Sequence, residues 1–189
     1  MRYFLAIPLP EEIKKELHAI NAFLSKFKDL RLVSPDNMHL TLLFLGENGD
    51  LKKIDKLKKI NFDSFNLKTK KVSVFPSDGK IKLVWIELEE SKKLLRLQQK
   101  ISELFNITAN YKPHITLARI KKIDKITKQK LSGEIDKFGS LKLNIPVKNF
   151  KLYGSELTVL GPVHRVIEYF EANKSKSLGK TNGVNKKTC

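Results

Sequence analysis

Apolar positions near the start of the chain alternate between short continuous runs and a helical stripe. Tyr3–Leu9 is an apolar run rich in β-forming residues, which predicts a buried strand. Pro10 and the two acidic residues after it favour the first turn of a helix. The helix would bury one face, at spacings of three and four, formed by Ile13, Leu17, Ile20, Leu24 and Phe27. A second strand is predicted at His39–Leu45, so the segment forms a strand–helix–strand unit.

The same order recurs in the rest of the chain. The pattern predicts further strands at 67–75, 80–88, 113–120, 141–153 and 163–171, and helices at 51–60, 91–105 and 123–138. Turn-forming residues separate the strands at 76–79, and a loop is expected at 154–162. Because strand, helix and strand follow one another twice, the sequence predicts two similar lobes that share a sheet, with a concave groove between them.

Composition favours one domain with a basic surface. The chain has 189 residues, and 37 Lys and Arg against 20 Asp and Glu give it a net charge of +17. Residues 1–172 are expected to form a single domain, whereas 173–189, with lysines and no acid, are expected to be a flexible tail. The remaining positive charge favours polyanionic partners such as nucleic acid. The alternative is that lysines simply solvate the helix surfaces.

Several classes of protein are excluded by what the sequence lacks. No apolar run approaches the length of a membrane-spanning helix, so no membrane partner is expected. The start of the chain does not resemble a signal peptide. Cys189 is the only cysteine, which excludes a disulfide scaffold. An intracellular, cytoplasmic protein is therefore expected.

One short motif occurs twice. His39-Leu40-Thr41-Leu42 is matched 75 residues later by His114-Ile115-Thr116-Leu117, and each copy lies in the strand that closes its unit. Side chains alternate across a strand, so each histidine shares a face with its threonine and the apolar residues take the other face. The two polar faces are predicted to line the groove.

This doubled motif resembles that of the two-histidine (2H) phosphoesterases, and within them the RNA 2′,3′-cyclic phosphodiesterases, also called 2′–5′ RNA ligases. The similarity extends over roughly residues 1–171 and is carried by the opening strand, Asn37–Gly46 and Tyr111–Arg119, and by Ser155-Glu156-Leu157 with Gly161-Pro162. It implies a bilobal α+β fold, with antiparallel sheets and the two motifs facing each other across a central cleft. It also implies a monomer whose substrate is RNA ending in a 2′,3′-cyclic phosphate, tRNA halves among them.

The resemblance implies a division of roles that two near-equivalent motifs cannot reveal by themselves. His114 would accept a proton from water, and His39 would protonate the departing 3′-oxygen, which leaves a 2′-phosphate. Thr41 and Thr116 would donate hydrogen bonds to the non-bridging phosphate oxygens. With an RNA 5′-hydroxyl in place of water, the same groups would form a 2′–5′ linkage.

A basic residue near the second motif is a further candidate. Arg119 would bind substrate phosphate, but strict alternation puts its side chain opposite His114, so a bulge or a strand end would be needed. The alternative for Arg119 is a surface role.

Four aromatic residues have weaker functional interpretations. Phe44 and Trp85 could stack a base, but core packing is favoured for both, and alternation places Phe44 on the side facing the helices. His18 is interpreted as a solvated residue and His164 as a structural one.

No cofactor is expected. The sequence has no cluster of His, Cys, Asp and Glu at metal-ligand spacing and no phosphate-binding glycine-rich loop, which agrees with the metal-independent reaction that the resemblance implies. Two alternatives remain for the function. One is a phosphodiesterase of the same superfamily acting on 2′–5′ oligonucleotides or other cyclic nucleotides. The other is an RNA-binding module without turnover.

Overall fold

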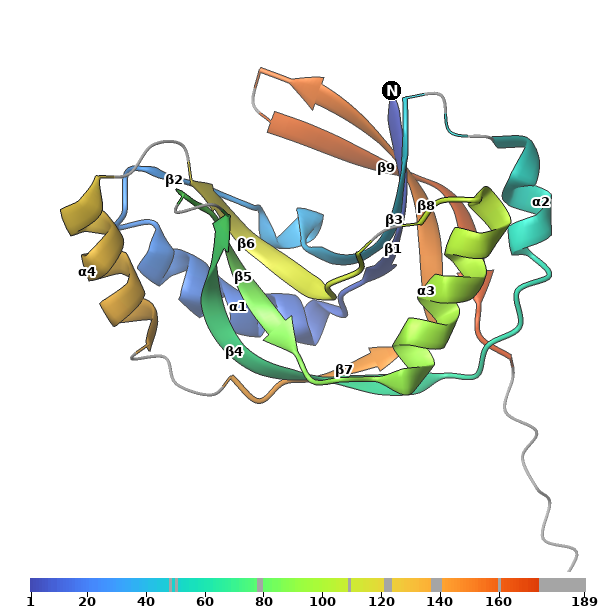
Figure 1. Ribbon diagram of the computed structural model, residues 1–189, viewed down its shortest axis with the longest axis horizontal. Helices are drawn as coiled ribbons and strands as arrows, with labels where there is room; N and C mark the ends of the chain where they lie inside the picture. The colour runs from blue at the N-terminus through green and yellow to red at the C-terminus, as the bar shows by residue number, and fades with distance from the viewer. Residues whose placement is uncertain are drawn as a thin grey trace, which may run out of the picture.

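The computed structural model describes residues 1–47, 49, 51–77, 80–108, 110–120, 124–136, 141–159 and 161–173 (Figure 1). The predicted tail, apart from Asn173, lies outside the described residues. The elements, in order, are β1 (Arg2–Pro8), α1 (Glu11–Leu24), β2 (Leu30–Leu32), the 3-10 turn η1 (Pro35–Asn37), β3 (His39–Gly46), the 3-10 turn η2 (Leu51–Lys53), α2 (Ile54–Leu57), β4 (Phe65–Ser77), β5 (Lys80–Leu88), α3 (Lys92–Phe105), β6 (His114–Ile120), α4 (Lys125–Asp136), β7 (Asn144–Val147), β8 (Asn149–Thr158) and β9 (Gly161–Glu171).

Within the described residues the strands form one strongly curved antiparallel sheet. Its order is β7-β4-β5-β6-β3-β1-β8-β9, and β2 also pairs with β6. We call β3, β1, β8 and β9 the His39 lobe, and β2, β6, β5, β4 and β7 the His114 lobe. The predicted α+β fold with two antiparallel lobes is confirmed, and the two sheets are halves of one sheet (Figure 1).

α1 and α3 each contact a strand of the lobe opposite to that of the strand they follow, whereas α4 contacts β4 of its own lobe. α3 follows β5 in sequence but contacts β3, and α1 follows β1 but contacts β2 (Figure 1). The predicted apolar stripe of α1 is buried from Ile13 to Leu24, whereas Phe27 lies beyond the end of the helix and is only partly buried. Ser91 caps the start of α3, and its hydroxyl accepts a hydrogen bond from the backbone N–H of Leu94. The crossed helices hold the two lobes in one core.

Two predictions about the last strands were wrong. The expected strand 141–153 is divided into β7 and β8, which pair with β4 and β1 on opposite sides of the sheet. The expected loop 154–162 is instead mostly strand, because β8 and β9 pair from Asn149 with Glu171 to Thr158 with Gly161. Turn-forming residues at the tip therefore mark a hairpin that extends beyond the sheet (Figure 1). In the described part of the chain, no helix has the length and apolar character needed to cross a membrane.

Candidate active site

The two repeated motifs meet where the lobes join. β3 and β6 pair antiparallel with Leu40 opposite Ile115, the central residues of the two motifs. This register directs His39 toward Thr116 and His114 toward Thr41. Leu40 and Ile115 are buried, while the four polar side chains are partly exposed. The structure thus brings together the four residues that the sequence singled out, all on the face opposite the core.

Each imidazole is oriented by the backbone just before it. Nδ1 of His39 lies 2.7 Å from the carbonyl oxygen of Asn37, and Nδ1 of His114 lies 2.8 Å from that of Lys112. A carbonyl oxygen only accepts, so each Nδ1 carries a hydrogen and donates it. Nε2 is left as the nitrogen that can take up or release a proton toward the cleft. The same tautomer is therefore fixed in both motifs.

A matching irregularity follows both motifs. Ala6 pairs with Thr41 and Leu5 with Leu43, which leaves Leu42 unmatched in β3. In β6, Leu117 is unmatched in the same way, between partners of Trp85 and Val84. An unmatched residue is a β-bulge, which shifts the alternation of the side chains that follow. The two consecutive residues in each bulge are accordingly both buried: Leu42 and Leu43, Leu117 and Ala118.

The bulges turn the fifth residue after each histidine toward the cleft face. Arg119 therefore lies on the side of His114, as the expectation that it binds phosphate requires, and its side chain is exposed. Phe44 is the equivalent residue after His39. It is 67% exposed and lies 6.0 Å from the ring of Phe4, so the expected core packing of Phe44 is wrong. The prediction failed because strict alternation does not hold across a bulge.

His39 lies within a cluster of aromatic rings. Its ring centroid is 4.8 Å from Phe4, 6.1 Å from Tyr153 and 5.5 Å from His164. Burial, with smaller contributions from the charges of His164, His114 and Arg119, lowers the pKa of His39 to about 4 against a raising effect of the Asn37 carbonyl. His39 is therefore neutral at pH 7 when the cleft is empty.

His114 has a more open environment. Its ring is 4.8 Å from that of Trp85, a partly buried residue of β5. Burial lowers the pKa of His114, the Lys112 carbonyl raises it, and the charge of Arg119 lowers it again. Trp85 was expected in the core, but the structure places its ring against the second histidine instead.

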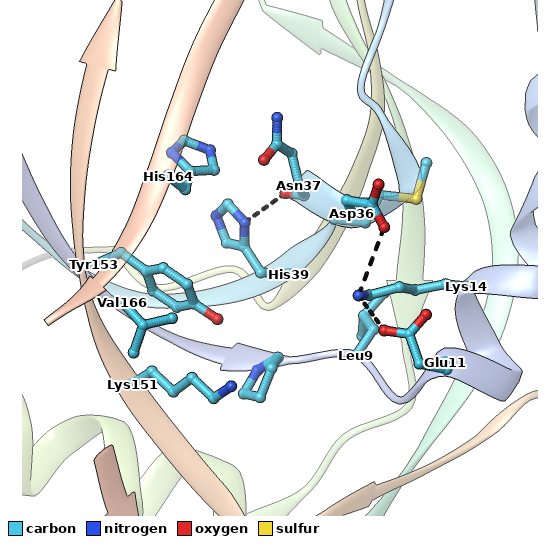
Figure 2. A pocket seen from close by; sticks show the side chains of 12 residues that line it. Leu9, Glu11, Lys14, Asp36, Asn37, His39, Lys151, Tyr153, His164 and Val166 are labelled. Atoms are coloured by element: carbon cyan, nitrogen blue, oxygen red, sulfur yellow. Dashed lines mark hydrogen bonds and ion pairs between the residues drawn. The ribbon is translucent and has the colours of Figure 1, made fainter. Parts of the chain in front are cut away.

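A cavity of about 270 Å³ opens beside His39. It is bounded by the start of α1, by η1 and by the facing side chains of β8 and β9 (Figure 2). Lys14, Lys151, Tyr153 and His164 contribute polar atoms to its wall, and Lys14 is held by an ion pair with Glu11. The cavity therefore extends the site from His39 along the His39 lobe.

Three residues near His39 were missed as site residues by the sequence analysis. Phe4 comes from the opening strand, and Tyr153 and His164 come from the last hairpin, where His164 was interpreted as structural. No spacing in the sequence connects them with His39, because they come together only through the order β3-β1-β8-β9. His18, by contrast, is exposed on α1 as expected.

In the part of the chain that the structure describes, no three His, Cys, Asp or Glu side chains gather as metal ligands would. The polar groups at the seam are two imidazoles, two hydroxyls and one guanidinium. Such a set can bind an anion and move protons on either side of it.

A family model described as LigT-like phosphoesterase matches the chain twice, over residues 7–85 and 86–164. The chain belongs to the LigT-like phosphoesterase family. The two matches meet within β5, between Trp85 and Ile86, and each contains one His-x-Thr motif. The recognised 2H resemblance is thereby confirmed.

Named relatives match this chain over nearly its whole length. A Methanocaldococcus jannaschii protein named RNA 2′,3′-cyclic phosphodiesterase is 35% identical over 178 residues, which are 89% of this chain and 99% of the relative. Proteins of the same name from Archaeoglobus fulgidus and Thermotoga maritima are 31% and 33% identical, covering 90% and 88% of this chain and 100% and 93% of their own.

Solved structures show the same fold. A crystal structure of a Thermus thermophilus protein superposes with a TM-score of 0.74 at 29% identity, covering 90% of this chain and 97% of that one. The crystal structure of Escherichia coli LigT without ligand gives 0.73 at 22% identity, covering 92% and 98%. The bilobal LigT-like fold is therefore shared along almost the entire length of these chains.

Proposed function

We propose that this LigT-like protein is an RNA 2′,3′-cyclic phosphodiesterase that works by acid–base catalysis with two histidines. The names of the relatives support the substrate class. The observation that carries the mechanism is the pairing of two identically oriented imidazoles, each with Nδ1 bound to a carbonyl, across the β3–β6 seam. Two imidazoles with Nε2 directed into one cleft suit a reaction that needs a base and an acid on opposite sides of phosphorus.

In the proposed reaction, Nε2 of His114 removes a proton from water as the water oxygen attacks phosphorus. The bond from phosphorus to the 3′-oxygen breaks, and that oxygen takes a proton from Nε2 of His39. The product is a 2′-phosphomonoester. Thr41 and Thr116 donate hydrogen bonds to the non-bridging oxygens, and Arg119 adds positive charge where negative charge develops. The cavity beside His39 accommodates the ribose that carries the leaving oxygen.

The acid role of His39 requires its pKa to rise when substrate binds, because burial sets it at about 4 in the empty cleft. A unit negative charge 4 Å from an imidazolium contributes about 4 kcal/mol at an effective dielectric constant of 20. This amount corresponds to about three pKa units. The phosphate itself would therefore bring His39 close to half protonation at neutral pH, so that the acid forms mainly in the presence of substrate.

An RNA 5′-hydroxyl in place of water would give ligation through a 2′–5′ linkage with the same proton movements. The energy comes from opening the strained cyclic phosphate, so no nucleotide triphosphate enters the scheme. Ends of this kind occur on cleaved RNAs, and tRNA halves are candidates among them. Hydrolysis and ligation would be in competition at one site.

The test is incubation of the purified protein with RNA ending in 2′,3′-cyclic phosphate, in the presence of a chelator, followed by identification of the product. A 2′-phosphate formed without added metal is expected. A 3′-phosphate product would contradict the assignment of the leaving oxygen. Preference for 2′–5′-linked oligoadenylate would favour the alternative phosphodiesterase, and binding of RNA without consumption of the cyclic end would favour a binding module.

A further inference from the structure

A second arginine lies beside the candidate phosphate ligand. In the β2–β6 pair, Arg31 is directly opposite Arg119. Residues opposite one another in an antiparallel pair point to the same face, with Cβ atoms about 5 Å apart. Since the bulge at Leu117 turns Arg119 toward the cleft, Arg31 faces the cleft as well. Both side chains are exposed.

In the described part of the chain, no acidic neighbour neutralises the two guanidinium groups. Among the residues that the structure describes, neither Arg31 nor Arg119 forms an ion pair with a carboxylate. Like charges directly opposite one another are unfavourable in a sheet. Guanidinium groups are well suited to phosphate, which they can bind through two parallel hydrogen bonds. The pair is therefore arranged for a ligand with concentrated negative charge.

The hairpin tip connects Arg31 with the His39 side of the cleft. Gly161 has a φ of +127°, and a Cβ at this position would lie 3.1 Å from Nη2 of Arg31. A side chain here would thus be strained and would crowd the guanidinium. The next residue, Pro162, accepts a hydrogen bond of 3.1 Å from the side-chain amide of Asn37, the residue whose carbonyl orients His39. Arg31 consequently lies between the hairpin tip and β6, at the rim of the cleft.

The position of Arg31 differs from that of the groups around the reacting phosphate. Along β6 from the seam, the side chains of His114, Thr116 and Arg119 follow one another, and Arg31 lies beside the last of them. The reacting phosphate lies at the seam in the proposed reaction. Every further nucleotide adds another phosphate to the RNA chain, and one of these phosphates can reach Arg31.

We propose that Arg31 binds the phosphate on the 5′ side of the terminal nucleotide, next to the 2′,3′-cyclic phosphate that reacts. The assignment rests on the proposed function and makes the site selective for an RNA end over a lone cyclic nucleoside phosphate. Arg119 lies between the two phosphates, and Arg31 binds the phosphate that is farther from the seam.

Two small substrates test the assignment directly. A nucleoside 2′,3′-cyclic phosphate with a free 5′-hydroxyl is compared with the same compound carrying a 5′-phosphate. In the wild-type protein the 5′-phosphate is expected to raise kcat/KM about tenfold or more, as for a hydrogen bond to a charged group. In Arg31→Ala the ratio of kcat/KM between the two substrates should fall to near one. In Arg31→Lys part of the advantage should remain, because lysine keeps the positive charge but lacks the paired N–H donors of a guanidinium group.

The matched control is Arg96→Ala, which removes the same charge from an exposed position on α3 and should keep the wild-type ratio. Thermal unfolding and circular dichroism check that each variant is folded. The assignment is overturned if the 5′-phosphate gives no advantage in the wild-type protein, or if Arg31→Ala lowers kcat/KM for both substrates by the same factor.

Failure of the proposed function would give a different result from failure of the Arg31 assignment. If the wild-type protein consumes neither compound, the reaction is wrong, and binding of a 5′-phosphorylated dinucleotide with a 3′-phosphate end is measured instead at several salt concentrations. Arg31→Ala should then weaken binding and lower the salt dependence by about one phosphate contact. Unchanged affinity and salt dependence would show that Arg31 does not contact the phosphate.

Discussion

The two lobes hold the same motif on the same backbone but surround it with different side chains. In both, the histidine Nδ1 is bound to the carbonyl two residues earlier, and a bulge follows the threonine. The fifth residue after the histidine is Phe44 in one lobe and Arg119 in the other. The backbone therefore determines where the imidazoles lie, whereas the neighbouring side chains determine how easily each one gains a proton.

The difference is greatest in the immediate surroundings of the rings. His39 is packed among Phe4, Tyr153 and His164, and its pKa falls to about 4. His114 lies beside Trp85 and the charge of Arg119, and its pKa is also lowered. A doubled motif thus surrounds its two imidazoles with different neighbours, and burial lowers the pKa of both.

The largest expected effect comes from removing either imidazole. His39→Gln and His114→Gln should each lower kcat on cyclic-phosphate RNA by about 10²–10⁴-fold, because each removes one proton-transfer group. Single-turnover rates measure this effect, and His18→Gln, on the exposed face of α1, is the control. A folded variant of either motif with the wild-type rate would contradict the two-histidine mechanism.

The aromatic cluster of the His39 lobe should be sensitive to loss of its buried ring. Phe4 is 3% exposed, so Phe4→Ala should lower the free energy of unfolding by about 3–5 kcal/mol. Phe44→Ala, in the same lobe but 67% exposed, should change it by less than about 0.5 kcal/mol. Urea denaturation of both variants measures the difference. Equal losses would show that the two rings are equally buried.

The low pKa of His39 should appear as a pH dependence of stability. The unfolded chain binds a proton to this histidine near pH 6.5, whereas the folded protein does so only near pH 4. The stabilisation that comes from burying neutral His39 is therefore fully present above pH 6.5, and it is lost as the pH falls toward 4. Between pH 7 and pH 5 the free energy of unfolding should fall by about 2 kcal/mol from His39 alone.

Denaturation curves for the wild-type protein and for His39→Gln at both pH values isolate this contribution. In His39→Gln the free energy of unfolding should fall less between pH 7 and pH 5 than in the wild-type protein. In His114→Gln most of the wild-type fall should remain. A wild-type protein equally stable at pH 7 and pH 5 would show that His39 is not buried in its neutral form.

The smallest expected effect concerns His164, which has no counterpart beside His114 among the described ring contacts. Its charge lowers the pKa of His39, so His164→Gln should move the titration of His39 to higher pH. The shift is measured by following the His39 ring resonances by NMR from pH 3 to pH 8. His18→Gln should leave the titration in place, and an unmoved midpoint in His164→Gln would show that the two rings do not interact.

Much of this arrangement could be predicted from local patterns in the sequence. The stripe from Ile13 to Leu24 predicted α1, and the repeat of His39 and Thr41 at His114 and Thr116 indicated the four candidate site residues that the structure brings together. Both depend on short-range periodicity, which the chain keeps through most of its elements.

The parts that were missed depend on deviations from that periodicity. The bulges have no glycine to mark them, and their one visible sign is a pair of consecutive small or apolar residues, Leu42-Leu43 and Leu117-Ala118. The neighbours of His39 come from β1, β8 and β9, so they depend on the order of strands in the sheet, which local spacing does not encode. Arg31 is likewise found only through its register with Arg119.

The pairing of Leu40 with Ile115 has a mechanical consequence. It joins the two lobes at the middle of both motifs, with each histidine one residue away from the joint. A rotation of one lobe against the other about this joint would change the distance between the two imidazoles. Close packing of Leu40 against Ile115 thus sets the distance between the two imidazoles, and substitutions at these two buried positions are expected to change the rate of the proposed reaction without contacting the substrate.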